Sequence, residues 1–362
     1  MTLVTIPIRS QSKTYSVVSG GTPAEALSRA RGVGPVVVIA DAAVLRLHQE
    51  AFQKAFDPDV LIVPIVATEH AKTYEALGPV LERLLEAGVR RNTTLVAVGG
   101  GIVQDLAAFA ATILMRGIAW RLVPTTLLAQ CDSCIGAKSS INLGRHKNQL
   151  GTFHAPEEIH LSAGFLATLS EEDLRSGLGE IVKFHLLAGT EAFHRIRDLL
   201  VRGRPDDLTG LVIDSLHIKR PFIEEDEFDQ GRRNILNYGH TFGHAFEMVS
   251  GFSIPHGLAV ALGMSAATYI SEASKRCPAG HAQEVDESLR LLYRHHAQTI
   301  AQASIPAIIE AMVRDKKNQA DRQFVILTAG PGRMEKVQVD LHRDIAPALA
   351  EFQAWLGRGA SP

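Results

Sequence analysis

The chain lacks any apolar run near the roughly 20 residues that a membrane-spanning helix requires. It also lacks a basic start followed by an apolar block, because Met1–Val18 alternates apolar and polar residues like a strand and unlike a signal peptide. Neither sign of charge is in excess, since 37 basic and 39 acidic residues give a net charge of −2. These absences predict a cytoplasmic protein whose main partner is neither a membrane nor a nucleic acid.

Cysteine is scarce, with three residues in the whole chain. Cys131 and Cys134 form a CxxC spacing, which redox centres and zinc sites both use. No second CxxC is present, and the surrounding "PTTLLAQCDSC" does not resemble a thioredoxin active-site turn. We therefore expect reduced thiols packed near a loop.

The length of 362 residues suits two domains, each with its own core. In the first half, short β-branched runs at 36–40, 60–65, 94–98 and 121–124 alternate with helical patterns. This order predicts a Rossmann-like α/β domain with a parallel sheet over residues 1–165. A period of 3.6 residues dominates afterwards and predicts an all-α domain over 166–362. Ligands of such sheets bind at the carboxyl ends of strands, so we expect a site between the domains.

A glycine turn follows the third of these strands. In "VAVGGGIVQD", Gly99, Gly100 and Gly101 join an apolar strand to a helix. Backbone amides at such a turn can approach a phosphate, and the helix dipole favours its charge. The spacing is not GxGxxG, so a tight turn without a ligand is the alternative reading.

The segment 125–148 is rich in glycine and serine and has little apolar periodicity. It reads as a long loop, and long loops are usually functional or disordered. Its lysines and amides suit a phosphorylated or carboxylated ligand; a solvated loop is the alternative. The polar residues in question are Asp132, Lys138, Asn142, Lys147 and Asn148.

Histidines four residues apart, His240 and His244, fall on one face of a predicted helix. A metalloprotease HExxH motif is excluded because Thr241 stands where the glutamate is needed. His256 and Glu180 could join them, and histidines with one carboxylate and an open position describe a catalytic zinc site. The spacing also fits histidines that simply pack within the fold.

Further cationic and amide side chains occur in other segments of the chain. Glu180 and Lys183 are i, i+3 neighbours with apolar residues around them, which favours a buried pair over an exposed salt bridge. A substrate with two anionic groups would explain so many cations in a nearly neutral protein. The others are Arg233, Asn237, Lys316 and Lys317.

In chain order, these motifs resemble those of 3-dehydroquinate synthases and the wider sugar phosphate cyclase family. The matching segments cover most of the sequence and keep the family's spacing. They are "GGGIVQDLAAFAATILMRG", "PTTLLAQCDS", "KNQLGTFHAP", "GLGEIVK", "GRRNILNYGHTFGHAFE", "HGLAVALGM" and "DKKN". The family's fold, a nucleotide-binding α/β domain followed by a helical domain, agrees with the pattern described above.

The resemblance implies NAD at the N-terminal domain. Asp41 would hold the adenine ribose, and Glu69 and Lys72 in "TEHAK" are similar to a second cofactor contact of the family. The other implied cofactor contacts are Gly99, Gly100, Gly101, Asp105, Thr125, Thr126, Asp132, Lys138 and Lys147.

The resemblance also implies a zinc ion, with Co²⁺ as a possible substitute, held by Glu180, His240 and His256. His244 is implied instead as a contact of the substrate phosphate with a role in proton transfer. Arg116 is similar to an arginine that reaches the partner subunit's site, so a homodimer is implied. The implied substrate contacts are Asp132, Lys138, Lys147, Asn148, Lys183, Lys219, Arg233 and Asn237, with one of Lys316 and Lys317.

The activity that this resemblance implies is that of a lyase of the shikimate pathway, which leads to aromatic amino acids. It would convert 3-deoxy-D-arabino-heptulosonate 7-phosphate to 3-dehydroquinate and phosphate. The steps are a transient NAD-dependent oxidation, phosphate elimination, re-reduction, ring opening and an intramolecular aldol reaction, so that NAD is regenerated in each turnover.

Some positions depart from the 3-dehydroquinate synthase pattern. Gln104 and Ala108 stand where those enzymes usually have glycine. "NLGRHKN" replaces the usual "NHPLGKN" and places His146 before Lys147, which is closer to valiolone-type cyclases acting on sedoheptulose 7-phosphate.

The cationic set favours the carboxylated substrate, because a carboxylate needs partners such as Lys219 and Arg233. Asn237 also matches the 3-dehydroquinate synthase set, whereas valiolone-type enzymes are expected to have aspartate there. A glycerol dehydrogenase-like alcohol dehydrogenase shares the architecture but needs no phosphate clamp. A binding protein without activity would have no reason to keep both a zinc triad and an NAD set.

Overall fold

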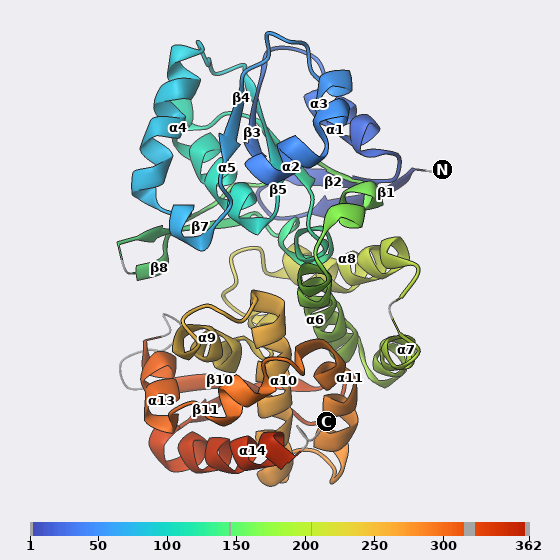
Figure 1. Ribbon diagram of the computed structural model, residues 1–362, viewed down its shortest axis with the longest axis vertical. Helices are drawn as coiled ribbons and strands as arrows, with labels where there is room; N and C mark the ends of the chain where they lie inside the picture. Colours follow the sequence, from blue (N-terminus) through green and yellow to red (C-terminus); the bar gives the residue numbers. More distant parts are fainter. Residues whose placement is uncertain (1–2, 145, 204, 315–322, 359–362) are drawn as a thin grey trace. The chain divides into compact units, whose positions relative to one another are not determined.

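The computed structural model describes residues 3–144, 146–203, 205–314 and 323–358 (Figure 1). The chain forms two compact units. The first comprises Met1–Ser170 with Arg220–Phe228, and the second comprises Glu171–Lys219 with Asp229–Pro362. Within the described residues, no helix has the length and apolar character needed to cross a membrane.

The first unit is built on a seven-stranded sheet in the order β1-β2-β9-β6-β5-β3-β4. Only β1 runs antiparallel to its neighbour, so the predicted parallel sheet is confirmed. The strands are β1 (Val4–Arg9), β2 (Thr14–Ser19), β3 (Val36–Asp41), β4 (Ile62–Ile65), β5 (Thr94–Gly99), β6 (Trp120–Pro124) and β9 (Glu158–Leu161).

Helices cover the sheet because its central strands are apolar on both faces. Val38 of β3 and Val96 of β5 pack with Phe52 of α3 on one face, and α5 packs on the other (Figure 1). The helices are α1 (Pro23–Arg31), α2 (Ala42–Leu47), α3 (Gln49–Ala55), α4 (Tyr74–Glu86) and α5 (Gly101–Ile113). Short turns add η1 (Glu69–Ala71), η2 (Leu114–Arg116), η3 (Ala129–Ser133) and η4 (Ala163–Thr168).

The segment predicted as a long loop is largely regular. It contains the π-helical turn η3 and the strand β7 (Lys138–Leu143), and its last residues begin β8 (His146–Phe153), which forms a hairpin with β7. The hairpin escaped prediction because polar contacts join its strands, such as the 2.7 Å hydrogen bond between the hydroxyls of Ser139 and Thr152. Such pairs leave no alternation of apolar and polar residues in the sequence.

The second unit is mostly helical, as predicted, and centres on α10, which is buried almost all round. Its helices are α6 (Glu171–Ala188), α7 (Thr190–Val201), α8 (Leu208–Glu225, whose last residues belong to the first unit), α9 (His240–Val249), α10 (His256–Ala273), α11 (His281–Tyr293), α12 (Ala297–Ala301), α13 (Ile305–Val313) and α14 (Ala346–Arg358). Short turns are η5 (Arg232–Asn237) and η6 (Leu341–Ile345). An antiparallel hairpin, β10 (Gln323–Thr328) and β11 (Met334–Val339), packs against α10 and corrects the expectation of helices alone.

Candidate functional site

The predicted nucleotide residues of the first unit meet at one edge of its sheet. Strands β3, β5 and β6 are parallel neighbours, so their carboxyl ends lie side by side. Asp41 ends β3, Gly99 ends β5 and Thr125 follows β6. The Thr125 amide donates a 3.0 Å hydrogen bond to the Gly99 carbonyl. This edge is where ligands of open α/β sheets bind.

The glycine turn packs too closely for side chains. A Cβ at Gly100 would lie 2.9 Å from Cγ2 of Thr126, and α5 begins at Gly101. Among the described residues, no side chain caps the amino end of α5. Its first backbone amides therefore face the sheet edge in the arrangement that binds phosphate groups.

Gln104, a departure from the family pattern, has a defined role in this structure. Its buried side chain donates a 2.6 Å hydrogen bond to the Ser133 carbonyl and accepts one of 2.9 Å from the Ser133 hydroxyl. Ser133 ends η3, the turn that carries Asp132. Gln104 therefore ties the helix after the glycine turn to the segment that carries a predicted site residue.

We expect Gln104→Ala to lower the free energy of unfolding by about 1–3 kcal/mol, because it leaves the partly buried Ser133 carbonyl without this donor. Urea unfolding followed by circular dichroism measures the change. Gln53→Ala, an exposed helical position of the same unit, is the matched control. Equal unfolding midpoints for Gln104→Ala and the wild type would show that the hydrogen bonds between Gln104 and Ser133 contribute nothing to stability.

A buried ion pair links two predicted cofactor residues. Lys72 Nζ lies 2.6 Å from Asp105 Oδ2, and the Ser140 amide donates to Asp105 Oδ1 at 3.2 Å. Burial raises the pKa of Asp105 above its usual range, although the Lys72 ammonium acts in the opposite direction. Lys72 and Asp105 are therefore held together in a poorly solvated position.

Asn142 connects this region to the β7–β8 hairpin. Its amide nitrogen donates to Glu69 Oε1 at 2.9 Å, and its amide oxygen accepts a 2.8 Å hydrogen bond from the Asn148 amide. Asn148 has φ of +52°, so its position depends on such contacts. Lys147 Nζ lies 3.3 Å from Glu69 Oε1. Four predicted polar residues are thus connected in series, with Glu69 and Asn142 in the middle.

The remaining predicted residues of the first unit differ in exposure. Lys138, at the start of β7, is exposed, and Asp132 is half-buried. Arg116 is exposed on a turn where both it and Met115 have positive φ, at +62° and +50°. Non-glycine residues adopt this conformation at a cost, and such strain is concentrated at functional sites. Among the described residues, Cys131 and Cys134 are buried and in no disulfide, which agrees with the expected reduced, packed thiols.

In the second unit, a carboxylate and two imidazoles converge. Oε1 of the fully buried Glu180 lies 3.5 Å from His240 Nε2 and 3.4 Å from His256 Nε2. One ligand atom from each residue lies within 4.8 Å of the others. Ligands of a tetrahedral zinc ion with bonds of about 2.1 Å are spaced about 3.4 Å apart. The donor set and its spacing therefore fit a zinc ion.

A close crossing of α6 and α10 helps to bring these ligands together. A Cβ at Gly179 would lie 2.2 Å from the Gly257 carbonyl oxygen, and a Cβ at Gly257 would lie 1.8 Å from that of Ser176. The backbones of α6 and α10 can approach this closely only because these two positions have no side chain. Each glycine is adjacent in sequence to a proposed ligand, so the close approach brings the ligands near one another. Figure 1 shows α10 between α6 and α9, and it packs against both.

The second nitrogen of each histidine also has an acceptor. His240 Nδ1 lies 3.3 Å from the Tyr238 carbonyl, which precedes Gly239 with φ of +79°. His256 Nδ1 lies 3.2 Å from Glu247 Oε1. Acceptors at Nδ1 fix the tautomer that presents Nε2 to a metal. Neither acceptor was predicted from the sequence, although Glu247 lies seven residues after His240 and so on the same helical face.

The charges around Glu180 favour its ionised form. Burial opposes ionisation, but Lys183, which forms an ion pair with it, and His256 more than offset that effect, so the pKa of Glu180 lies below its usual range. Burial acts against the charged form of His256 as well, yet Glu247 and Glu180 raise its pKa above the usual range of histidine. The predicted buried pair of Glu180 and Lys183 is confirmed.

The structure also describes the other predicted site residues of the second unit, apart from two lysines. The ring of His244 lies 5.5 Å from that of His240 and 5.8 Å from that of His256. Lys219 and Arg233 are buried cations, and the side-chain amide of Asn237 donates to the Asn234 carbonyl at 3.0 Å. Lys316 and Lys317 lie outside the described residues.

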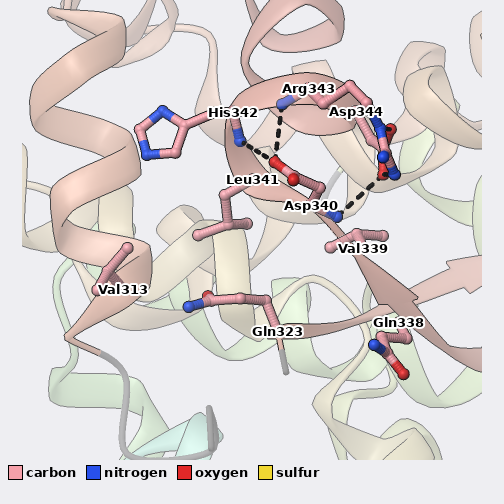
Figure 2. A pocket seen from close by; sticks show the side chains of 9 residues that line it. All are labelled: Val313, Gln323, Gln338, Val339, Asp340, Leu341, His342, Arg343 and Asp344. Carbon is pink, nitrogen blue, oxygen red and sulfur yellow. Dashed lines mark hydrogen bonds and ion pairs between the residues drawn. The ribbon is translucent and has the colours of Figure 1, made fainter. Parts of the chain in front are cut away.

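A cavity of about 520 Å³ lies elsewhere in the second unit (Figure 2). Val313, Gln323 and the segment 338–344 line it. Its charged side chains are already engaged, since Arg343 pairs with Asp344 at 2.8 Å and Asp340 accepts the amides of His342 and Arg343. None of the described site residues lines this cavity, so it is not the candidate site.

Known solved structures share this fold. The chain is similar to 2-deoxy-scyllo-inosose synthase, crystallised with carbaglucose-6-phosphate, NAD⁺ and Co²⁺, at 25% identity and a TM-score of 0.84 over 96% of this chain and 100% of that one. It is also similar to 2-epi-5-epi-valiolone synthase from Streptomyces hygroscopicus, solved with NAD⁺ and Zn²⁺, at 26% identity and a TM-score of 0.82 over 95% and 97% of the two chains.

Sequence comparison covers the same length. Residues 62–176 match the family model of the 3-dehydroquinate synthase N-terminal domain, and residues 177–318 match that of its C-terminal domain. The 3-dehydroquinate synthase of Acidithiobacillus ferrooxidans is 37% identical over 307 residues, which are 83% of this chain and 84% of that protein. The chain therefore belongs to the 3-dehydroquinate synthase family.

Proposed function

We propose that the protein is a 3-dehydroquinate synthase, a phosphate-eliminating lyase of the shikimate pathway that uses NAD and zinc. Its substrate would be 3-deoxy-D-arabino-heptulosonate 7-phosphate, and its products 3-dehydroquinate and phosphate. The observation that carries the proposal is the fully buried Glu180 with the Nε2 atoms of His240 and His256 at 3.5 and 3.4 Å, in a chain of this family.

Bound NAD would supply reversible hydride transfer, and bound zinc, or Co²⁺ in its place, would act as a Lewis acid on the oxidised carbon's oxygen. Glu180, His240 and His256 would hold the metal. The first unit would bind NAD at the sheet edge, with Asp41 on the ribose and the amides of the glycine turn on the pyrophosphate. The proposed cofactor contacts also include Glu69, Lys72, Asp105, Thr125, Thr126, Asp132, Lys138 and Lys147.

The chain's cations would neutralise the substrate's two anionic groups. Lys219 and Arg233 are buried, and a buried cation stabilises a carboxylate strongly because little water screens the pair. His244 would contact the phosphate and move the proton that leaves with it. Contacts are also proposed at Asp132, Lys138, Lys147, Asn148, Lys183 and Asn237.

A homodimer belongs to the proposal, with Arg116 reaching the partner subunit's site. The exposure of Arg116 and its positive φ support this role, because strained backbone conformations are concentrated at functional sites. We also propose a cytoplasmic location, since both the phosphorylated substrate and NAD are metabolites of that compartment.

A cyclase that acts on sedoheptulose 7-phosphate is the alternative function that a specific observation supports. The "NLGRHKN" segment, with Lys147 in β8, is closer to cyclases that act on sedoheptulose 7-phosphate, and one similar structure is a 2-epi-5-epi-valiolone synthase. Such a substrate has no carboxylate. Lys219 and Arg233 are buried cations of the kind that bind a carboxylate, and this favours the shikimate substrate.

The deciding experiment measures phosphate release by the zinc- and NAD-loaded protein, with the two sugar phosphates in parallel. Release from 3-deoxy-D-arabino-heptulosonate 7-phosphate alone, without net NADH, is expected. Release from sedoheptulose 7-phosphate alone would establish the alternative. Accumulation of NADH without phosphate would indicate an alcohol dehydrogenase of the glycerol dehydrogenase type, and would overturn the proposal.

A further inference from the structure

His256 is the residue whose two ring nitrogens face different carboxylates. Nε2 lies 3.4 Å from Glu180 Oε1, and Nδ1 lies 3.2 Å from Glu247 Oε1. Glu180 comes from α6 and Glu247 from α9, whereas His256 is the first residue of α10. The imidazole is therefore held between carboxylates of two other helices.

The two histidines of the cluster differ in what supports them. His240 Nδ1 faces the Tyr238 carbonyl, a neutral acceptor, at 3.3 Å. His256 Nδ1 instead faces the carboxylate of Glu247, an anion. The Glu247 side chain is 15% exposed, and that of His256 is 37% exposed. A partly buried carboxylate at Nδ1 both fixes the ring orientation and makes Nε2 a stronger electron donor than a carbonyl does.

We propose that Glu247 is a positioning residue that sets the metal affinity of the site by orienting and polarising His256. The inference rests on the proposed metal-binding role of Glu180, His240 and His256. It assigns Glu247 to hydrogen bonding at Nδ1 and leaves Nε2 for the ion.

A competing arrangement uses Glu247 as a direct ligand. His244, Glu247 and His256 also place ligand atoms within 4.8 Å of one another, and the two groups share His256. The first group is favoured because its carboxylate, Glu180, is fully buried. Glu180 Oε1 also faces the Nε2 atoms of His240 and His256 at 3.5 and 3.4 Å, whereas Glu247 is partly exposed and faces Nδ1 of His256.

The test uses the full chain with bound NAD and Co²⁺ as the metal probe, since its visible spectrum reports the ligand set. Bound metal per chain, the dissociation constant by chelator competition and the spectrum are measured. For Glu247→Gln we expect one ion per chain at saturation, an unchanged spectrum and an affinity 10- to 100-fold below that of the wild type. A purely structural residue would change stability without this selective loss of affinity.

Glu172→Gln is the matched control, because Glu172 also pairs with a histidine of the same unit, at 3.0 Å from His296 Nε2. Its metal affinity should equal that of the wild type. Glu247→Asp, which keeps the carboxylate, should bind more tightly than Glu247→Gln, and it carries the test if the glutamine variant does not fold.

Two results would overturn the inference while leaving the proposed function intact. One is an affinity of Glu247→Gln within twofold of the wild type. The other is a spectrum changed in the same way as that of Glu180→Gln, which would make Glu247 a ligand. A wild-type protein that binds no divalent metal would instead remove the metal role itself and the inference with it.

Discussion

Glu180→Gln is expected to release zinc from the protein and to lower the rate of phosphate release on the order of 10³-fold. A Lewis-acid metal contributes several kcal/mol to transition-state stabilisation, and each 1.4 kcal/mol corresponds to a factor of ten in rate. The substitution keeps the size of the side chain but removes the only carboxylate of the proposed ligand set. NAD affinity should not change, because the proposed NAD contacts belong to other residues.

The same substitution also breaks a buried ion pair. Glu180 and Lys183 are 0% and 2% exposed, and loss of one partner from such a pair typically costs about 3–5 kcal/mol of stability. The double variant Glu180→Gln/Lys183→Met replaces both charges and should recover much of that stability. It should not recover zinc, so it separates the metal-binding role of Glu180 from its role in folding.

Metal content by mass spectrometry, phosphate release and urea unfolding together decide the outcome. Glu284→Gln is the control, because Glu284 also lies beside a histidine, 2.9 Å from His194 Nε2, but at a partly exposed position. It should match the wild type in zinc content and rate. Wild-type zinc content in Glu180→Gln would show that Glu180 does not ligate the ion.

Residue type and local spacing indicate candidates for the metal cluster, whereas the choice of Glu180, His240 and His256 over His244 comes from the family resemblance. His240 and His244 share a helical face, and the apolar residues around Glu180 and Lys183 indicate burial. Glu247 could not be assigned in this way. Its role depends on the turn between α9 and α10, which returns His256 to the face of α9.

Some elements of the fold could not be predicted from the sequence either. The buried strands β3, β5 and β6 stand out as apolar runs, whereas β9 is four residues long and includes the polar His160. Gly179 and Gly257 lie 78 positions apart in the sequence, and their shared purpose appears only where α6 crosses α10. Long-range contacts of this kind leave no periodic signal.

Lys72→Met is expected to weaken NAD binding about 10- to 100-fold and to destabilise the first unit. Lys72 is proposed to contact the cofactor, and a hydrogen bond from a charged group contributes about 1.5–3 kcal/mol. Its ammonium also lies 2.6 Å from Asp105, and loss of one partner of a buried pair costs about 3–5 kcal/mol. The two effects can be told apart by their dependence on pH.

The pKa of Asp105 is raised by burial even with Lys72 present. The folded state therefore holds this proton more tightly than the unfolded state, so stability falls as pH rises above the ordinary pKa of aspartate. Without Lys72, the pKa of Asp105 in the folded state rises further, and the free energy of unfolding continues to fall up to a higher pH. The stability difference between Lys72→Met and the wild type should thus be smallest near pH 4 and largest near pH 8.

Urea unfolding at several pH values and NAD titration by fluorescence measure both effects. Lys72→Met/Asp105→Asn should remove the pH-dependent part of the loss, because no buried carboxyl remains at that position. Lys54→Met is the control, since Lys54 pairs with Glu50 at 3.7 Å on the surface of the same unit. A stability loss in Lys72→Met that is independent of pH would contradict the proposed effect on Asp105. Unchanged NAD affinity would place the cofactor away from this pair.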